Sequence, residues 1–296
     1  MTWRNLAGLA LFGMILAPTS VVAQPAGEPG EGGGGVLAQM MSLSKPGPMK
    51  ATLRDIATID IPKGYRFVPE SNMRAFNSLF QNTTSGSELG AILPDPKETF
   101  WFLVFDWTGD GYVKDDERDK LDAAAILKSR QEMQEADNNN RAKQGWAKLE
   151  IPGWSKEPFY DPETNNLTWG LRVRDLGAPV SEESVNYESK LLGRRGYVSA
   201  VLVGSAEEVN QAIPAYKSLL KNFSYNGGQR YTDFQSGDKI AEYGLTALAA
   251  GGILALAAKS GLLGKLLKPL IAVGVLIIAG ISSVFKKIFG GGNRDA

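Results

Sequence analysis

The stretch of sequence that decides the fold is Val185-Asn-Tyr-Glu-Ser-Lys-Leu-Leu192, Gly193-Arg-Arg-Gly196 and Tyr197-Val-Ser-Ala-Val-Leu-Val203. Two runs that contain β-branched and aromatic residues flank a short turn with two glycines, a pattern typical of a β-hairpin. Because a hairpin joins antiparallel strands, this stretch predicts an antiparallel sheet.

Segments on both sides of the hairpin extend this prediction. Strands are expected at 56–61, 65–68, 99–105, 147–151, 167–174 and 222–226. Helices are expected at 73–80, 115–141 and 206–220, and the second is the longest because it is charged, Ala-rich and free of Gly and Pro. Runs of strands with few helices between them predict an α+β fold with a largely antiparallel sheet, one long helix and one or two shorter ones.

The N-terminal region predicts export. Arg4 precedes an apolar run from Leu6 to Ala17, and Val21 and Ala23 fit the small-residue rule for cleavage after Ala23. We therefore expect a signal peptide at 1–23, with an uncleaved N-terminal anchor as the alternative. The segments expected after it are a disordered Gly- and Pro-rich leader at 24–49 and a periplasmic domain at 50–236.

The C-terminal region predicts a transmembrane hairpin of two helices. The apolar stretches 240–258 and 270–286 approach the length needed to cross a bilayer and lack the polar face of an interfacial helix. A buried helical hairpin in a soluble core is the alternative. The connection 259–269 has three lysines and no acid, and export of the domain places it in the cytoplasm and the tail, 287–296, in the periplasm.

The first apolar stretch also carries a small-residue pattern. Ala247, Gly251 and Ala255 recur every four residues, which would form a face for close helix packing. Its partner would be the second stretch, a second copy of the chain or another membrane protein.

Composition excludes several classes of function. The chain has 32 basic and 32 acidic residues, so it lacks the basic excess that favours nucleic-acid binding. It has no cysteine, which excludes disulfides, cysteine-ligated metals and thiol nucleophiles. It has no histidine, which excludes Ser-His-Asp triads and histidine-based zinc hydrolases. These absences favour a binding protein over an enzyme, although catalysis by carboxylates stays open.

The segment 106–117 has the spacing of an EF-hand calcium loop. The residues at positions 1, 3, 5, 6, 7 and 12 are Asp106, Thr108, Asp110, Gly111, Tyr112 and Glu117. Alternate oxygen ligands in this arrangement can wrap one Ca²⁺ ion, and the last glutamate can bind it bidentately. The alternative is a strand-to-helix turn, because an aromatic strand rather than a helix precedes the loop.

Two further features could bind a ligand. Arg194 and Arg195 lie at the tip of the hairpin, where they could contact anionic lipid headgroups or an acidic partner, or simply be solvated. Seven aromatic residues could line a groove but are more typical of a core; they are Trp101, Trp107, Trp146, Trp154 and Trp169, with Phe159 and Tyr160.

Several segments form a recognisable set. They are Gly64-Tyr-Arg-Phe67, Trp101-Phe-Leu-Val-Phe105, Gly111-Tyr-Val-Lys-Asp-Asp-Glu117, Leu191-Leu-Gly-Arg-Arg-Gly196 and Gly228-Gln-Arg-Tyr-Thr-Asp-Phe234. Together they resemble a family of bacterial membrane-anchored proteins catalogued as a domain of unknown function. The resemblance covers residues 50–290 and implies the same envelope topology, but no activity, cofactor or catalytic residue. It also implies that serine is common at the position of Asp110, which would confine the calcium interpretation to this chain.

These observations lead to three hypotheses. We expect a protein of the bacterial inner membrane whose periplasmic domain is a non-enzymatic binding or interaction module. Its partners would be membrane lipid and another membrane or periplasmic protein, without nucleic acid. The second hypothesis is a calcium-binding envelope module that uses the 106–117 loop, and the third is a carboxylate-based hydrolase acting on an envelope polymer. Apart from Ca²⁺, no cofactor is expected.

Overall fold

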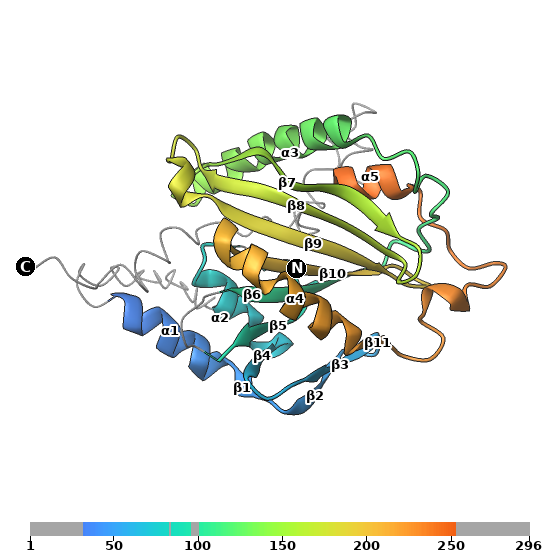
Figure 1. The fold of residues 1–296 in the computed structure, drawn as a ribbon, viewed down its shortest axis with the longest axis horizontal. Coiled ribbons are helices and arrows are strands. Elements are labelled where there is room, and N and C mark those ends of the chain that lie inside the picture. The colour runs from blue at the N-terminus through green and yellow to red at the C-terminus, as the bar shows by residue number, and fades with distance from the viewer. Residues whose placement is uncertain (1–31, 83, 96–100, 253–296) are drawn as a thin grey trace, which may run out of the picture. The chain divides into compact units, whose positions relative to one another are not determined.

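The computed structural model describes residues 32–82, 84–95 and 101–252. These residues belong to one compact unit of the chain. They form a large sheet, a small sheet, five α-helices and three short 3₁₀ helices (Figure 1).

Both sheets are antiparallel throughout. The large sheet has eight strands in the order β1-β4-β5-β6-β10-β9-β8-β7, and the small sheet has the order β11-β3-β2. The strands of the large sheet are β1 (Lys45–Pro46), β4 (Tyr65–Pro69), β5 (Glu88–Pro94), β6 (Phe102–Thr108), β7 (Leu149–Asp161), β8 (Asn166–Asp175), β9 (Ser184–Leu192) and β10 (Tyr197–Ser205). Those of the small sheet are β2 (Met49–Leu53), β3 (Ala57–Ile61) and β11 (Phe223–Tyr225). The predicted α+β fold with a largely antiparallel sheet is confirmed.

The predicted hairpin forms the centre of the large sheet. β9 and β10 pair from Leu192 opposite Tyr197 to Ser184 opposite Ser205. Gly196 closes the turn against β6, with φ at 157°, and a Cβ added there would lie 1.9 Å from the carbonyl oxygen of Thr108. Only glycine therefore fits this position without moving the backbone.

Alternation along β6 divides its residues between two cores. Leu103 and Phe105 belong to the cluster that contains the small sheet and α4 (Ala206–Lys221). Phe102 and Val104 point to the other face. Helix α4 starts with a capping box, in which Ser205 and Glu208 satisfy each other's backbone N–H groups. Its buried residues recur at helical spacing; they are Val209, Ala212, Tyr216 and Leu219.

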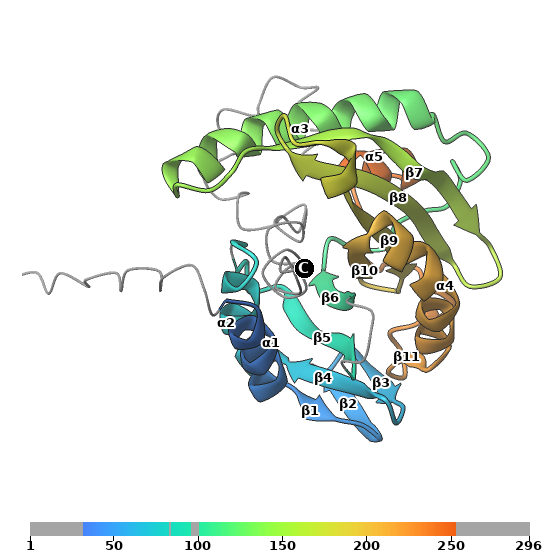
Figure 2. The same cartoon turned by 60° about the vertical axis from the view of Figure 1, so that its left-hand side comes forward.

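Two pairs of helices lie on the opposite face of the large sheet (Figure 2). Helices α1 (Gly32–Leu43) and α2 (Met73–Ser78) bury apolar side chains against its β4-β5-β6 end. Helices α3 (Ala123–Lys143) and α5 (Leu245–Ala250) pack against the β7-β8 end, in a cluster that includes Trp169.

The predicted disordered leader is wrong for residues 32–49. Residues 32–43 form α1, in which Met40 is fully buried and Val36 and Leu43 are partly buried against α2 and the sheet. These three side chains give the segment an apolar stripe at helical spacing, and tertiary packing outweighs the low helix propensity of its glycines. Residues 24–31 lie outside the described residues.

The longest helix begins later than predicted. Helix α3 starts at Ala123 rather than Asp115, because Asp122 has an extended backbone and its carboxylate accepts the N–H of Ala125 as an N-cap. Strand β5 was not predicted, and Gly90 within it approaches Phe67 and Val68 too closely for a side chain.

The first predicted membrane span is also wrong in its described part. Residues 240–252 contain only the six-residue helix α5, whose Leu245 and Leu248 are at most 1% exposed within the domain. Gly251 ends the helix with φ at 128°, so Ala247 and Gly251 do not share a continuous helical face.

Among the described residues, no helix has both the length and the hydropathy needed to cross a bilayer. The predicted signal peptide at 1–23, the rest of the first stretch, the loop at 259–269, the second span at 270–286 and the tail lie outside the described residues.

Candidate functional site

The residues of the predicted calcium loop are held by different neighbours. Asp106 is buried in β6, and Thr108 ends that strand. Asp110 accepts a hydrogen bond from the hydroxyl of Tyr243, and Glu117 accepts the N–H of Thr246 at 2.9 Å.

Tyr112, the remaining predicted ligand of the loop, is also held by neighbours of its own. Its backbone bonds to Lys239 and Ala241, and its ring stacks on Tyr231 at 4.4 Å. Within the described residues, no three carboxylates are placed to hold a metal ion together. The segment 106–117 therefore clamps residues 239–246 to the domain, and the geometry does not support an EF-hand.

The two arginines of the hairpin tip have different surroundings. Arg194 is paired with Asp238 at 2.7 Å and is therefore not available to a lipid headgroup. The guanidinium holds the pKa of Asp238 at about 2, well below its usual range. Arg195 is exposed, and its carbonyl accepts the N–H of Gly111.

The tryptophans do not form a common groove. Trp101 and Trp169 are buried in two different clusters. Trp154 donates its indole N–H to Ala123, and Trp146 lies under the guanidinium of Arg141 at 5.5 Å. Trp107 packs at the edge of the first cluster. Trp101 and Trp169 are core residues, Trp107 and Trp154 pack partly buried at the edges of clusters, and Trp146 belongs to none of the described clusters.

A row of polar side chains, buried except for the partly buried Lys190, crosses the large sheet. Glu88, Asp106, Ser199 and Lys190 occupy matching positions on β5, β6, β10 and β9. The ammonium group of Lys190 lies 2.6 Å from the hydroxyl of Ser199 and 2.6 Å from the carboxylate of Glu188.

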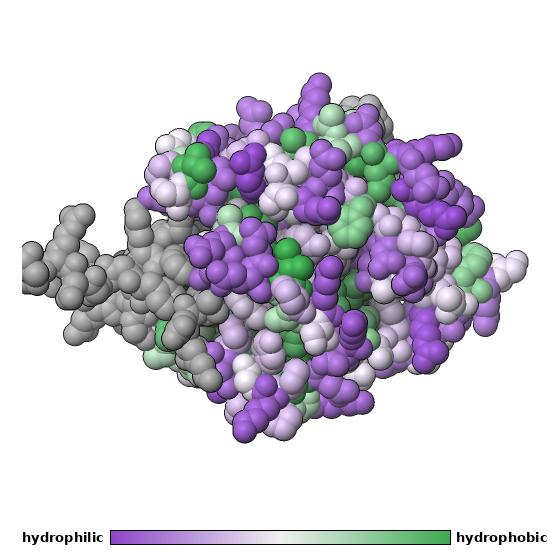
Figure 3. Space-filling model, viewed as in Figure 1, coloured by the Kyte–Doolittle hydropathy of each residue, from purple (hydrophilic) through white to green (hydrophobic). Residues whose placement is uncertain are grey.

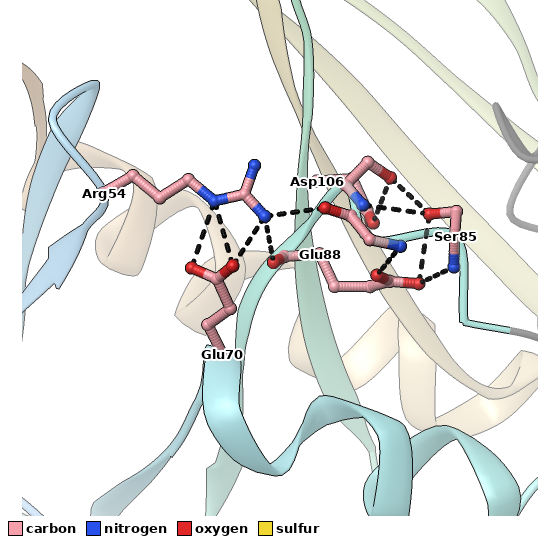
Figure 4. A network of polar contacts seen from close by, with 7 residues as sticks. Arg54, Glu70, Ser85, Glu88 and Asp106 are labelled. Atoms are coloured by element: carbon pink, nitrogen blue, oxygen red, sulfur yellow. Dashed lines mark hydrogen bonds and ion pairs between the residues drawn. The ribbon is translucent and has the colours of Figure 1, made fainter.

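The β5 end of this row is tied to the adjoining loop (Figure 4). The carboxylate of Glu88 accepts the backbone N–H groups of Ser85 and Gly86, each at 2.8 Å. Arg54 binds Glu70 and donates to the carbonyl of Gly86 at 2.7 Å. This end is a structural network that fixes the loop before β5.

Asp106 is the unusual member of the row. Ser87 donates to its Oδ1 at 3.4 Å, while its buried Oδ2 has no partner among the described residues. Burial, and then the charge of Glu88, raise the pKa of Asp106 to about 8. Asp106 is therefore largely protonated at neutral pH, which limits the negative charge buried beside Glu88 and Glu188.

The open site lies on the other face of the sheet. A groove of about 680 Å³ separates the C-terminal half of α4 and β11 from the turn between β7 and β8. Figure 1 shows the end of α4 beside β11. The volume lies within the usual range of small-molecule sites, roughly 300–1,000 Å³.

The floor of the groove is built from β8 and β9. Thr168 and Ser189 face each other across these strands, and their hydroxyls are 2.8 Å apart. Tyr187, 6% exposed, packs its ring edge-on against Tyr216 at 5.6 Å. Tyr216 and Tyr225 donate their hydroxyls to the carbonyls of the sheet at Ala200 and Leu191.

The Tyr187 hydroxyl differs from these neighbours. No group within the described residues forms a hydrogen bond to it, although most of the side chain is buried. Burial raises the pKa of the Tyr187 phenol, so the group is a neutral donor at the floor of the groove. The hydroxyl oxygen is not among the fully buried polar atoms that lack a partner, so it is open to a ligand or to water in the groove.

The rim of the groove is positively charged. Lys217 and Lys221 on α4, and Arg230 beside η3 (Tyr231–Asp233), are exposed and line the groove. None of the three forms a salt bridge with a described residue. The acid among the lining residues, Asp161, already accepts bonds from Glu163 and Thr164 in its own turn.

The sequence marked one lining residue of this groove, Phe159, as a possible groove-lining aromatic, and did not reveal the rest. The lining of the groove comes from the β7–β8 turn, β9, the end of α4, β11 and η3, which are distant in the chain. The local signal within it is Lys217 and Lys221, four residues apart on α4, and such a pair is common on solvated helix faces.

Comparison with known proteins identifies a family but no activity. The chain matches the family described as "Protein of unknown function (DUF2167)" over residues 45–282. No curated protein matches it. The solution structure of cyanobacterial PsbP (CyanoP) from Synechocystis sp. PCC 6803 is similar at 12% identity and a TM-score of 0.36, over 60% of this chain and 90% of that one. The family match spans most of the chain, so the expected resemblance is confirmed and the protein belongs to the DUF2167 family of proteins of unknown function.

Proposed function

We propose that this protein is a non-enzymatic binding module that holds its ligand in the groove between α4 and the β7–β8 turn. The observation that carries this proposal is the Tyr187 hydroxyl, which lines an open groove and has no described partner. A ligand that accepts a hydrogen bond from it would take the place of solvent at a donor that opens on the floor of the groove.

The arrangement of carboxylates supports binding over hydrolysis. A carboxylate-based hydrolase needs two acids that face each other across the substrate. Asp161 is the acid that lines the groove, and its carboxylate is held by its own turn. Glu88 and Asp106 do lie side by side, but both are buried under 5% exposure, out of reach of a polymer.

Ligand binding can be tested by filling the groove. Ser224 is exposed on β11 and lines the groove, so Ser224→Trp should occupy part of it without disturbing the core. We expect a small-molecule extract of the native cells to raise the Tm of the full-length wild-type protein but not of Ser224→Trp. An equal shift in both proteins, or none in either, would overturn the proposal.

We further propose that the domain is held on the periplasmic side of the bacterial inner membrane. The support is the signal-like segment 1–23 and the apolar stretch 270–286. Since residues 240–252 pack within the domain, 270–286 would be the anchor. Lys286 and Lys287 at its end would then be cytoplasmic under the positive-inside rule, which reverses the orientation expected from two spans.

Reporter fusions after Ala296 test this orientation. We expect green fluorescent protein to fluoresce there and alkaline phosphatase to be inactive, because the first needs the cytoplasm and the second the periplasm. The opposite pattern would rule out a single C-terminal span in an exported protein.

A further inference from the structure

If the proposed binding function is correct, the chemistry of the groove also indicates the chemical class of its ligand. We infer that the ligand is a soluble amphiphilic anion: a phosphate or carboxylate group joined to an apolar or aromatic body of small-molecule size. The inference comes from three independent features of the groove, namely its rim charge, its floor donor and its apolar walls.

The rim selects for negative charge. Lys217, Lys221 and Arg230 line the groove without a salt bridge to any described residue, whereas Asp161 is the acid among the lining residues. Free cations around a concave surface raise the local concentration of anions and lower that of cations. The arginine can hold two oxygens of a carboxylate or phosphate at once, and the lysines act as point charges.

The floor selects for hydrogen-bond acceptors. The Tyr187 phenol is neutral and has no described acceptor, so it can donate only to a group that enters the groove. The Thr168 and Ser189 hydroxyls bond to each other, and Ser189 also bonds to the Tyr216 hydroxyl, so Tyr187 is the floor donor left for a ligand. An anionic oxygen satisfies such a donor more strongly than a neutral one.

The walls select for an apolar body. Phe159, Leu220 and Phe223 line the groove beside the tyrosine rings, and Phe159 is 37% exposed. Stacking and apolar burial on these side chains would supply affinity that a bare ion cannot obtain.

The surroundings of the groove favour a soluble ligand over a bilayer lipid. Figure 3 shows the face of the molecule on which α4 lies in Figure 1. Its hydrophilic side chains are interrupted by small, separate apolar spots. A surface that inserted into a bilayer would present a continuous apolar patch flanked by basic residues.

Phenyl phosphate is the simplest probe that carries all three features. We expect calorimetry on the full-length protein to show binding of phenyl phosphate that is about tenfold tighter than that of inorganic phosphate. Phenol, which lacks the anion, should bind more weakly than phenyl phosphate. Vesicles of phosphatidylglycerol should not compete.

Substitutions in the groove test which residues contact phenyl phosphate. Lys217→Glu and Arg230→Glu should each weaken phenyl phosphate binding about fivefold. Tyr187→Phe should weaken it about tenfold, while the free energy of unfolding stays nearly unchanged because the hydroxyl opens on the groove and has no partner among the described residues. Lys128→Gln, an exposed lysine on α3 over the opposite face of the sheet, should bind as the wild type does.

The outcomes separate the two proposals. If phenyl phosphate does not bind, or binds equally to Lys217→Glu, Tyr187→Phe and wild type, the anion inference fails. The binding function still stands in that case, provided that native extract shifts the Tm of wild type and not of Ser224→Trp. If phosphatidylglycerol vesicles compete with phenyl phosphate, the groove binds a lipid headgroup, and the inference of a soluble ligand is wrong.

Discussion

Arg194 and Asp238 form a bidentate ion pair, with Nε 2.7 Å from Oδ2 and Nη2 2.8 Å from Oδ1. The pair joins the tip of the central hairpin to the segment that follows η3. Asp238 also accepts the N–H of Gln235, so one carboxylate closes a turn and docks it on the sheet. This segment leads to the residues that the 106–117 loop holds, which makes the ion pair part of the attachment of the C-terminal region to the domain.

The first prediction concerns the acid stability of this attachment. The pKa of Asp238 is lowered from 3.8 to about 2, so its stabilising contribution is present above pH 4 and is lost as the pH falls through 2. Arg194→Ala should therefore open residues 228–241 to hydrogen exchange at pH 6 and flatten the loss of stability between pH 4 and pH 2. Arg195→Ala, at the exposed neighbour, is the control, and equal exchange in the two variants would contradict the role of the pair.

The second prediction concerns Asp106, whose shift has the opposite sign. Its pKa rises from 3.8 to about 8, chiefly through burial and then through Glu88, with Lys190 opposing. The folded protein thus retains a proton that the unfolded chain releases, and stability should decline as the pH rises from 4 to 8. One proton corresponds to about 1.4 kcal/mol per pH unit within that window.

Asp106→Asn removes this titration. We expect the free energy of urea unfolding to decline less between pH 5 and pH 8 in Asp106→Asn than in wild type, and the variant to be the more stable protein at pH 8. Asp116→Asn, at an exposed acid, should keep the wild-type slope. Parallel pH profiles for Asp106→Asn and wild type would show that Asp106 is ionised in the folded state.

The third prediction concerns helix α1. Met40 is fully buried among Val68, Phe76 and Phe102, in a segment whose composition predicts disorder. Met40→Ala should lower the free energy of unfolding by about 2–4 kcal/mol, because a buried methionine leaves a cavity. Gln39→Ala, on the exposed side of the same helix, should change it by less than about 0.5 kcal/mol. Equal effects of the two substitutions would show that α1 does not pack on the domain and that residues 32–43 belong to the disordered leader.

The parts of the fold that local pattern determines were predictable. The β9–β10 hairpin, α2 and α4 follow from side-chain periodicity, turn glycines and caps, and the structure has them close to the expected bounds. The start of α3 was missed because the acidic residues 115–122 suit a helix N-terminus equally well, and only the bond from Ala125 to Asp122 marks the cap.

The parts of the structure that depend on contacts between distant residues could not be predicted from the sequence. The spacing of 106–117 fits a calcium loop, but spacing does not record that Asp106 follows the alternation of β6 into a sheet interior. The apolar run after residue 240 has the composition of a membrane span and is instead a core segment, since both environments select the same residues. Apart from Phe159, the lining of the groove could not be predicted, because the path of α4 across β9 and β10 brings it together.

The last prediction concerns the contact that holds α5 in place. Glu117 accepts the N–H of Thr246 in the first turn of α5, and a Cβ added at Gly244 would lie 2.8 Å from the Glu117 carboxyl carbon. Gly244 has φ at −98°, which alanine tolerates, so Gly244→Ala should act by displacing Glu117. Glu117→Ala removes the same acceptor and should lower stability by about 1 kcal/mol.

A double-mutant cycle tests whether the two substitutions act on one contact. If they do, Glu117→Ala/Gly244→Ala should be less destabilised than the sum of the single variants by about 0.5 kcal/mol or more, because the smaller side chain leaves room for the new methyl group. Urea unfolding of the four proteins measures the coupling. Strictly additive effects would mean that Gly244→Ala acts elsewhere, and that the 106–117 loop does not position α5 through this carboxylate.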